Sequence, residues 1–214
     1  MIDLHSHTFF SDGALGPAEL LRRAEYAGYK AMAITDHCDS SNLNIIPDIV
    51  RLCKDISENC NIRAIPGIEL THVPPKLISG MTGEARKLGA KVVIVHGETL
   101  VEPVCEGTNL AAIESHVDIL AHPGLITEDE VRLAKENNVY LEISARKGHS
   151  LANGHVASLA MKIGAGFLVN SDAHGPGDIM DMEFAKRVAL GAGLGEAGFN
   201  AAMFNAGELL EKVI

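Results

Sequence analysis

The chain has 214 residues, of which 47% are hydrophobic, and it carries a formal net charge of −10 at pH 7. This size and composition exclude a disordered chain and fit a single domain, residues 1–214, with a sizeable core. The acidic balance argues against an extended nucleic-acid groove, and no apolar run is long enough for a membrane-spanning helix. The N-terminal sequence MIDLHSHT lacks the basic and apolar segments of a signal peptide, so we expect a cytoplasmic protein without membrane contact.

Short apolar segments alternate with helical patterns along the chain. The predicted strands are Ile2–His7, Ala31–Asp36, Ile62–Leu70, Lys91–His96, Ile119–His122, Tyr140–Ser144 and Gly166–Ser171. The predicted helices are Pro17–Ala27, Ile45–Asn59, Pro75–Leu88, Asn109–Ser115, Thr127–Asn137, Gly154–Ile163 and Ile179–Leu190, with one or two closing helices between Glu196 and Val213. Seven strand–helix units in series predict an α/β fold in which helices cover a parallel sheet.

The four cysteines form no CxxC pair, and a cytoplasmic α/β protein of this size does not need disulfides. We therefore expect reduced thiols, with Cys53 and Cys60 buried as small apolar residues. Cys38 follows His37 directly and is a candidate for lining a site.

Histidine and carboxylate residues gather where the predicted strands end. They are His5 and His7 for the first strand, Asp36 and His37 for the second, Glu69 for the third, His96 for the fourth, His122 for the fifth, Glu142 for the sixth, and Asp172 and His174 for the seventh. An open sheet would spread these ends along a line, whereas a barrel closes them into a ring on one face. We therefore predict a closed, TIM-like β/α barrel with a site at the C-terminal ends of its strands.

Such a concentration of polar groups is costly to bury unless cations pair with it. His5 and His7 are two residues apart on one strand, so both side chains leave the same face. A single pair of this kind is a weak signal, but five strand ends with histidine on one side predict a metal centre. Imidazole and carboxylate ligands without thiolate suit zinc, manganese or iron. His116 precedes a strand and His155 opens a helix, so we expect both to lie outside this centre.

Six motifs carry a family resemblance. They are HSHTFFSDG (His5–Gly13), ITDH (Ile34–His37), PGIE (Pro66–Glu69), VHG (Val95–Gly97), AHPG (Ala121–Gly124) and NSDAH (Asn170–His174). In these motifs and their order the chain resembles the PHP family, the polymerase and histidinol phosphatase superfamily. The resemblance implies a distorted (β/α)7 barrel with two or three divalent metal ions.

Nine positions match the metal ligands of that family. The resemblance implies one ion held by His5, His7, Glu69 and Asp172, a second held by Glu69, His96 and His122, and a third held by Asp12, His37 and His174. Some relatives have a histidine where this chain has Asp12. A carboxylate also ligates, so the departure bears on which metal the third position prefers.

Further candidates lie in the loops on the same face. Arg146 and Lys147 follow the sixth strand and are candidates for binding phosphate, with a solvated basic pair as the alternative, chiefly for Lys147. We expect His149 to give a proton to the leaving group and His72 to contact the substrate. Asp36 is expected to orient a neighbouring metal ligand.

The loop between residues 97 and 109 should shape the pocket as well. It carries Glu98, Glu102, Glu106 and Asn109, and its acidic groups would favour a substrate with a cationic part.

Together these features predict a hydrolase of small phosphate monoesters, similar to histidinol phosphatases, that acts through metal-activated hydroxide. Three alternatives stay open. They are a phosphodiesterase or exonuclease on short nucleotides, a non-catalytic metal-binding regulatory module, and a hydrolase of lactones or amides. The expected partner is a small phosphorylated substrate, and nucleic acid longer than a short oligonucleotide is not expected.

Overall fold

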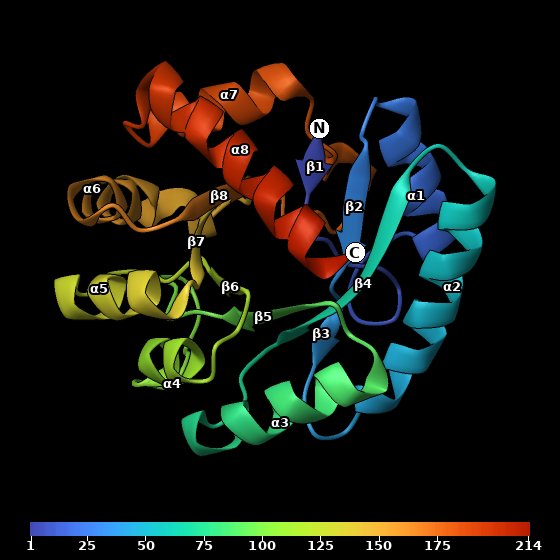
Figure 1. Cartoon of the computed structure of the whole chain (residues 1–214), viewed down its shortest axis with the longest axis horizontal. Coiled ribbons are helices and arrows are strands. Elements are labelled where there is room, and N and C mark those ends of the chain that lie inside the picture. The colour runs from blue at the N-terminus through green and yellow to red at the C-terminus, as the bar shows by residue number, and fades with distance from the viewer.

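The computed structural model describes residues 1–214, with parallel strands curled into a ring and helices around it (Figure 1). The strands are β1 Ile2–Asp3, β2 Ala31–Ile34, β3 His37–Cys38, β4 Arg63–Leu70, β5 Val92–His96, β6 Ile119–Ala121, β7 Tyr140–Ser144 and β8 Phe167–Asn170. The helices are α1 Pro17–Tyr26, α2 Ile46–Asn59, α3 Pro75–Leu88, α4 Thr108–Glu114, α5 Glu128–Asn137, α6 Asn153–Ile163, α7 Met182–Gly191 and α8 Gly195–Val213.

The sheet runs in the order β1-β2-β4-β5-β6-β7-β8, and every pairing is parallel. The ring meets itself between the segments that follow β8 and β1. There Ser6 forms a parallel bridge with Ala173, and the His7 amide donates to the Ala173 carbonyl at 2.8 Å. Helices α1 to α7 surround the ring in chain order (Figure 1). This confirms the predicted distorted, TIM-like (β/α)7 barrel.

The second predicted strand, Ala31–Asp36, is interrupted. Strand β2 ends at Ile34, and the chain pairs again only at β3, where His37 lies opposite Glu69. In between, Thr35 turns to Ser6, with hydrogen bonds from the Thr35 amide to the Ser6 carbonyl and from the Ser6 amide to Thr35 Oγ1. A side-chain oxygen thus replaces part of the strand ladder next to the closure of the ring.

The first predicted strand is also shorter than expected. Regular pairing covers only Ile2 and Asp3, because the Leu4 amide donates to Asn170 Oδ1 and the His5 amide to Asp3 Oδ1. These two contacts release the chain from the ladder just before His5.

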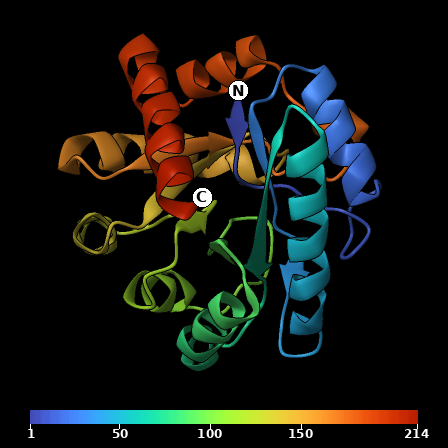
Figure 2. The ribbon, with the colours of Figure 1, turned by 45° about the vertical axis from the view of Figure 1, so that its right-hand side comes forward.

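Two apolar layers hold the barrel. One lies inside the ring, where Leu4, Ile94 and Leu168 share a cluster with Ala206 and Leu209 of α8. Helix α8 thereby covers the N-terminal ends of the strands (Figures 1 and 2), and the Asn205 side-chain amide donates to the Phe167 carbonyl at 2.9 Å. The tail beyond Glu196 thus forms a single helix.

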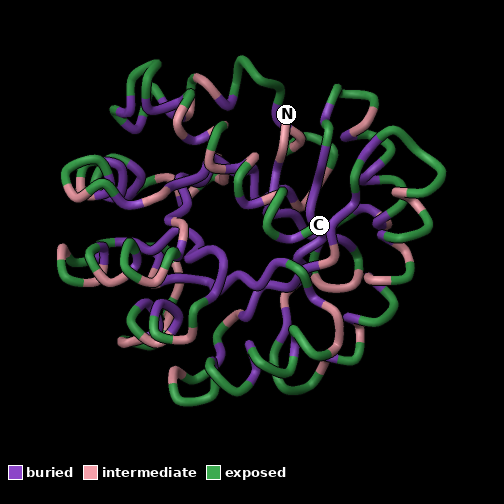
Figure 3. The backbone as a smooth tube through the Cα atoms, in the orientation of Figure 1, coloured by how far each residue is buried: buried purple, intermediate pink, exposed green.

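The other layer lies between the strands and the outer helices. Side chains alternate along each strand, so Val93 and Val95 of β5 face this layer while Val92 and Ile94 face the inside. The buried part of the backbone follows the ring, and the exposed part lies on the outer faces of the helices (Figure 3). None of the helices is long and apolar enough to cross a membrane.

The structure agrees with part of what we expected for the burial of the cysteines. All four are free thiols, and Cys53 is buried, but Cys60 is exposed because it follows the end of α2. Cys38 is buried in the outer apolar layer, not in the pocket described below.

Candidate metal centre

The carboxylate of Glu69, at the end of β4, lies at the centre of the predicted cluster and is fully buried. Its Oε1 atom is 3.4 Å from His5 Nε2, 3.5 Å from His96 Nδ1 and 3.6 Å from His122 Nε2. Its Oε2 atom is 2.7 Å from His37 Nδ1 and 3.7 Å from His7 Nε2. Five histidines from different parts of the ring therefore surround one carboxylate.

Asp172 is a second buried carboxylate in the same place. Its Oδ1 atom is 3.2 Å from His7 Nε2 and 3.4 Å from His174 Nδ1, and its Oδ2 atom is 3.7 Å from His122 Nε2. Asp172 has a φ of 52° and His122 a φ of 28°, and residues other than glycine rarely adopt such positive φ angles. The backbone leaves the extended conformation at these strand ends and aims both side chains into the ring.

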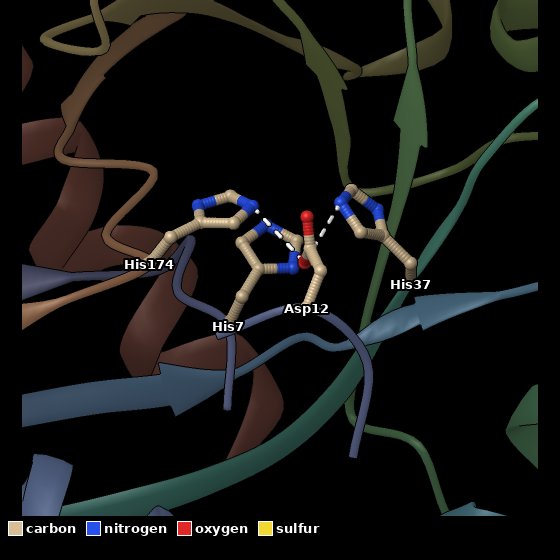
Figure 4. A group of neighbouring side chains, drawn as sticks. All are labelled: His7, Asp12, His37 and His174. Carbon is tan, nitrogen blue, oxygen red and sulfur yellow. Dashed lines mark ion pairs between the residues drawn. The ribbon is translucent and has the colours of Figure 1, made fainter. Parts of the chain in front are cut away.

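The Asp12 group lies nearer to solvent. Asp12 Oδ1 is 3.2 Å from His174 Nε2 and 3.5 Å from His37 Nε2, with His7 behind them (Figure 4). The Asp12 side chain is 57% exposed, whereas His37 and His174 are partly buried. The Asp12 group is therefore the part of the cluster that is open to solvent, on the side from which a ligand would enter.

The charges of the cluster influence one another strongly. Burial lowers the pKa of His5, but Glu142, Asp172 and Glu69 outweigh burial and raise it well above its usual value. Burial and neighbouring histidines hold the pKa values of His7 and His122 well below the usual range. Burial opposes ionisation of Glu69, yet His5 and His37 lower its pKa well below normal. Burial also raises the pKa of Asp172 to about 7.

Many of the buried polar atoms of this cluster form no hydrogen bond within the protein. Of the buried side-chain nitrogen and oxygen atoms without a hydrogen bond, all but Thr82 Oγ1 belong to the site or its immediate support. Such atoms are costly to bury, and metal coordination removes that cost. The groups with ligand atoms within 4.8 Å of one another are His7–Asp12–His37–His174, His5–His7–Asp172, His5–Glu69–His122, His122–His149–Asp172 and His72–His96–Glu102. The donor set therefore fits divalent ions that accept imidazole and carboxylate.

A cavity of about 250 Å³ opens above these groups, and no hydrophobic residue lines it. Its walls include Arg146, His149, His72 and Glu102. Arg146 Nη1 donates to the Asp172 carbonyl at 3.4 Å. The cavity suits a small, polar ligand.

Comparison with known proteins gives the chain its family. The PHP domain model matches residues 3–143. The chain belongs to the PHP family. An uncharacterized protein of Methanocaldococcus jannaschii is 50% identical over 90% of this chain and 89% of its own length. The DNA polymerase/3'-5' exonuclease PolX of Bacillus subtilis is 26% identical over 85% of this chain but only 35% of its own length. A protein of Aliivibrio fischeri named a probable phosphatase is 23% identical over 86% of this chain and 82% of its own.

Solved structures show the same fold at low identity. A Listeria monocytogenes protein described as a candidate histidinol phosphatase is 13% identical, with a TM-score of 0.58 over 84% of this chain and 97% of the other. The ochratoxinase of Aspergillus niger is 12% identical, with a TM-score of 0.65 over 98% of this chain and 70% of the other. These similarities show that proteins with different printed names share the barrel fold of this PHP protein.

The structure brings all nine predicted ligand residues of the PHP motifs to one end of the ring, whereas Lys147 lies elsewhere. Arg146 lines the central cavity, but Lys147 is exposed and lines a neighbouring hollow with Asp178 and Phe184. The chain turns at this basic pair after β7 has ended at Ser144, and Arg146 lines both hollows whereas Lys147 lines only the neighbouring one.

Asp36 holds the loop that follows His7. It accepts hydrogen bonds from the amides and hydroxyls of Thr8 and Ser11 and forms none with the ring of His37. The loop that it holds is the one that carries Asp12. In the acidic loop only Glu102 reaches the cavity, because Glu98 accepts from the amides of Gly107 and Asn109 instead.

The other two histidines lie outside, as expected. His116 is exposed, and the ring of His155 contacts the Ile126 carbonyl at 2.7 Å.

Two carboxylates have contacts that the sequence did not assign. Glu142 Oε2 lies 2.6 Å from His5 Nδ1, and Asn170 Nδ2 donates to the same oxygen. Glu102 lies 3.0 Å from His96 Nε2 and 3.5 Å from His149 Nε2. The sequence places Glu142 at the end of a predicted strand, but it does not indicate the contact with His5, because this contact depends on how the ring closes.

Proposed function

We propose that this PHP protein is a metal-dependent phosphoesterase acting on small phosphate monoesters. The observation that carries the proposal is the concentration of unpartnered, buried imidazole and carboxylate atoms beneath a small polar cavity. Membership of the PHP family supports the reaction class, and the names of the Aliivibrio and Listeria proteins support a phosphatase.

We assign the ions to the nine residues of the motifs. His5, His7, Glu69 and Asp172 would hold one ion, His96 and His122 with Glu69 a second, and Asp12, His37 and His174 a third. When bound, such ions lower the pKa of water and neutralise phosphate oxygens. Glu69 would be shared by the first two ions; its Oε1 atom faces His5, His96 and His122, and its Oε2 atom faces His7 and His37.

Arg146 would hold the phosphate at the open side of the cavity. Its guanidinium lies 3.9 Å from Asp172 Oδ2, close enough to be fixed by that carboxylate and far enough to keep donors for a ligand. A planar guanidinium binds two phosphate oxygens at once.

His149 would contact the leaving group as a neutral ring. Burial and the neighbouring His96 lower the pKa of His149 to about 4, so the ring is uncharged at neutral pH. Its Nδ1 atom is 2.8 Å from Thr99 Oγ1, and this contact fixes the orientation of the ring. We therefore assign His149 a hydrogen bond to the leaving oxygen, not the role of a charged acid, and His72 a contact with the rest of the substrate.

Exonuclease action, which the PolX relationship suggests, needs room for a nucleotide strand. The cavity volume of about 250 Å³ and the net charge of −10 favour a small monoester instead. Both substrate types belong in the same experiment.

Elemental analysis of the untagged protein, with hydrolysis of p-nitrophenyl phosphate and of bis-p-nitrophenyl phosphate before and after chelation, tests the proposal. We expect two or three transition metals per chain, with monoester hydrolysis lost on chelation and restored by manganese or zinc. Preference for the diester would replace the monoester assignment. Bound metal without hydrolysis of either ester would favour a lactonase, an amide hydrolase or a regulatory module. Absence of metal under reconstituting conditions would contradict the ligand assignment.

A further inference from the structure

Two groups of ligand atoms include residues outside the three positions assigned above, and one of them draws two of its three members from loops. It consists of His72, His96 and Glu102, which we call the outer group, at the mouth of the cavity. His72 and Glu102 belong to the loops after β4 and β5 and have no counterpart among the nine motif residues. Their side chains are 48% and 37% exposed, whereas His96 is 3% exposed.

The distances within the outer group match those between ligands of one ion. Glu102 Oε2 is 3.0 Å from His96 Nε2 and 3.4 Å from His72 Nε2. Bonds of 2.0–2.1 Å at tetrahedral angles place neighbouring ligand atoms about 3.3 Å apart. A third ring, that of His149, has Nε2 at 3.5 Å from Glu102 Oε1. One ion can therefore reach the carboxylate and two imidazoles with little movement.

His96 supplies the second observation. Both of its ring nitrogens are buried and lack a hydrogen-bond partner, although they face different surroundings. Nδ1 lies 3.5 Å from Glu69, on the inner side, and Nε2 lies beside Glu102, on the outer side. A polar atom that is buried, unpartnered and directed at a carboxylate and a second imidazole is the arrangement that a cation completes.

We propose that the outer group binds one divalent transition-metal ion through His72 Nε2, His96 Nε2 and a Glu102 oxygen. This position is distinct from the three formed by the motif residues. Its ligand set of two imidazoles and one carboxylate suits zinc, and a fourth position stays open to solvent.

An ion bound to the outer group would compete for His96 with the second ion of the motif residues, which we assigned to Glu69, His96 and His122. A neutral imidazole has one nitrogen lone pair, because the other nitrogen carries the proton. When Nδ1 serves the inner cluster, Nε2–H faces Glu102 without a hydrogen bond in this geometry; when Nε2 binds an outer ion, Nδ1–H faces Glu69 instead. Excess metal that fills the outer position therefore withdraws a ligand from the inner cluster and inhibits the enzyme.

Anomalous diffraction at the zinc edge locates the ion without reference to any substrate. Crystals of the zinc-loaded protein are compared before and after a soak in excess zinc, for the wild type and for His72→Asn and Glu102→Gln. His72 has a φ of 53°, which asparagine tolerates, so His72→Asn preserves the backbone. His116→Asn is the matched control, since His116 has a φ of 52° and lies far from the cavity on the opposite rim.

We expect the soak to add a zinc peak between residues 72, 96 and 102 in the wild type and in His116→Asn, and not in His72→Asn or Glu102→Gln. Inner peaks retained in the two variants show that they are folded. In solution, the zinc concentration that half-inhibits hydrolysis should rise at least about tenfold in His72→Asn. No outer peak in the soaked wild type, or an outer peak that persists in both variants, would overturn the proposal. Because the peak is independent of hydrolysis, its absence is distinguishable from failure of the phosphoesterase assignment.

Discussion

The carboxylate of Glu142 lies 2.6 Å from His5 Nδ1, and neither side chain has any exposed surface. This contact requires the proton of a neutral His5 ring to lie on Nδ1, so that the lone pair of Nε2 faces Glu69 and Asp172. Asn170 holds the carboxylate by donating to the same oxygen, and its own Oδ1 accepts from the Leu4 amide. A carboxylate behind a metal-binding imidazole fixes the ring and strengthens the ligand.

Glu142→Gln tests this role. The amide keeps the shape and an acceptor for Nδ1–H but loses the charge, so we expect the affinity for zinc to fall about 10- to 100-fold. Competition with a chromophoric chelator measures that affinity, and hydrolysis should recover when zinc is raised. Glu136→Gln, at an exposed position of α5, is the matched control and should match the wild type. Equal zinc affinity in Glu142→Gln and the wild type would exclude a positioning role.

The positions of eight of the nine motif residues were predictable because each lies at or just beyond the end of a predicted strand, whereas Asp12 was indicated only by the family resemblance. Parallel strands in a closed ring bring those ends together whatever the details of the loops. The partner of Glu142 was not predictable, since its contact with His5 joins β7 to the segment after β1 across 137 residues of sequence. That distance depends on barrel closure, which no local pattern reports.

Loop residues were the harder part of the prediction. Glu102 and Glu98 belong to the same acidic loop, yet one enters the cavity and the other binds backbone amides. Such a loop has no period of two or 3.6 residues from which side-chain direction follows. The break in the second strand was not predictable either, because it depends on hydrogen bonds between Thr35 and Ser6, which lie 29 residues apart in the sequence.

Arg146→Ala should reduce hydrolysis of phosphate monoesters by about 100-fold or more, the effect of removing one preorganised donor from an oxyanion. Metal content should not change, since Arg146 touches Asp172 only at the edge of the cluster. Arg146→Lys should recover little, because an ammonium lacks the planar fork. Lys147→Ala serves as the neighbouring control and should retain activity, as Lys147 lines a different hollow. Steady-state kinetics and elemental analysis of the three variants check these expectations; a larger loss in Lys147→Ala than in Arg146→Ala would reverse the assignment.

The cysteines should differ sharply in reactivity. Burial raises the pKa values of Cys38 and Cys53 to about 12, with nearby carboxylates adding to the effect at Cys38. Because the thiolate is the nucleophile, both thiols should resist alkylation at pH 8, whereas the exposed Cys60 and Cys105 react. Mass spectrometry of the iodoacetamide-treated protein should show two modified sites in the native state and four in urea. Rapid native labelling of Cys53 would contradict its position on the buried face of α2.

Asp3 should make the metal-free protein less stable as the pH rises from about 4 to about 6. Burial raises the pKa of Asp3 to about 6, although hydrogen bonds from Ser171 and the His5 amide oppose the shift. The folded state therefore holds its proton more tightly than the unfolded state, and ionising Asp3 costs up to about 3 kcal/mol once the pH exceeds the folded pKa. Below about pH 4 both states are protonated and this cost vanishes.

Asp3→Asn removes that ionisation while its Oδ1 can still accept from the amides of Ser171 and His5. Urea unfolding in the presence of a chelator should show equal stability of the variant and the wild type near pH 4. Their difference should grow in favour of the variant up to pH 7. Subtracting the two curves cancels the titration of the histidine cluster, which the variant and the wild type share. Asp55→Asn, at an exposed position of α2, should show no such difference. A difference that is independent of pH would mean that Asp3 is not ionised in the folded protein or that its charge is stabilised by a partner.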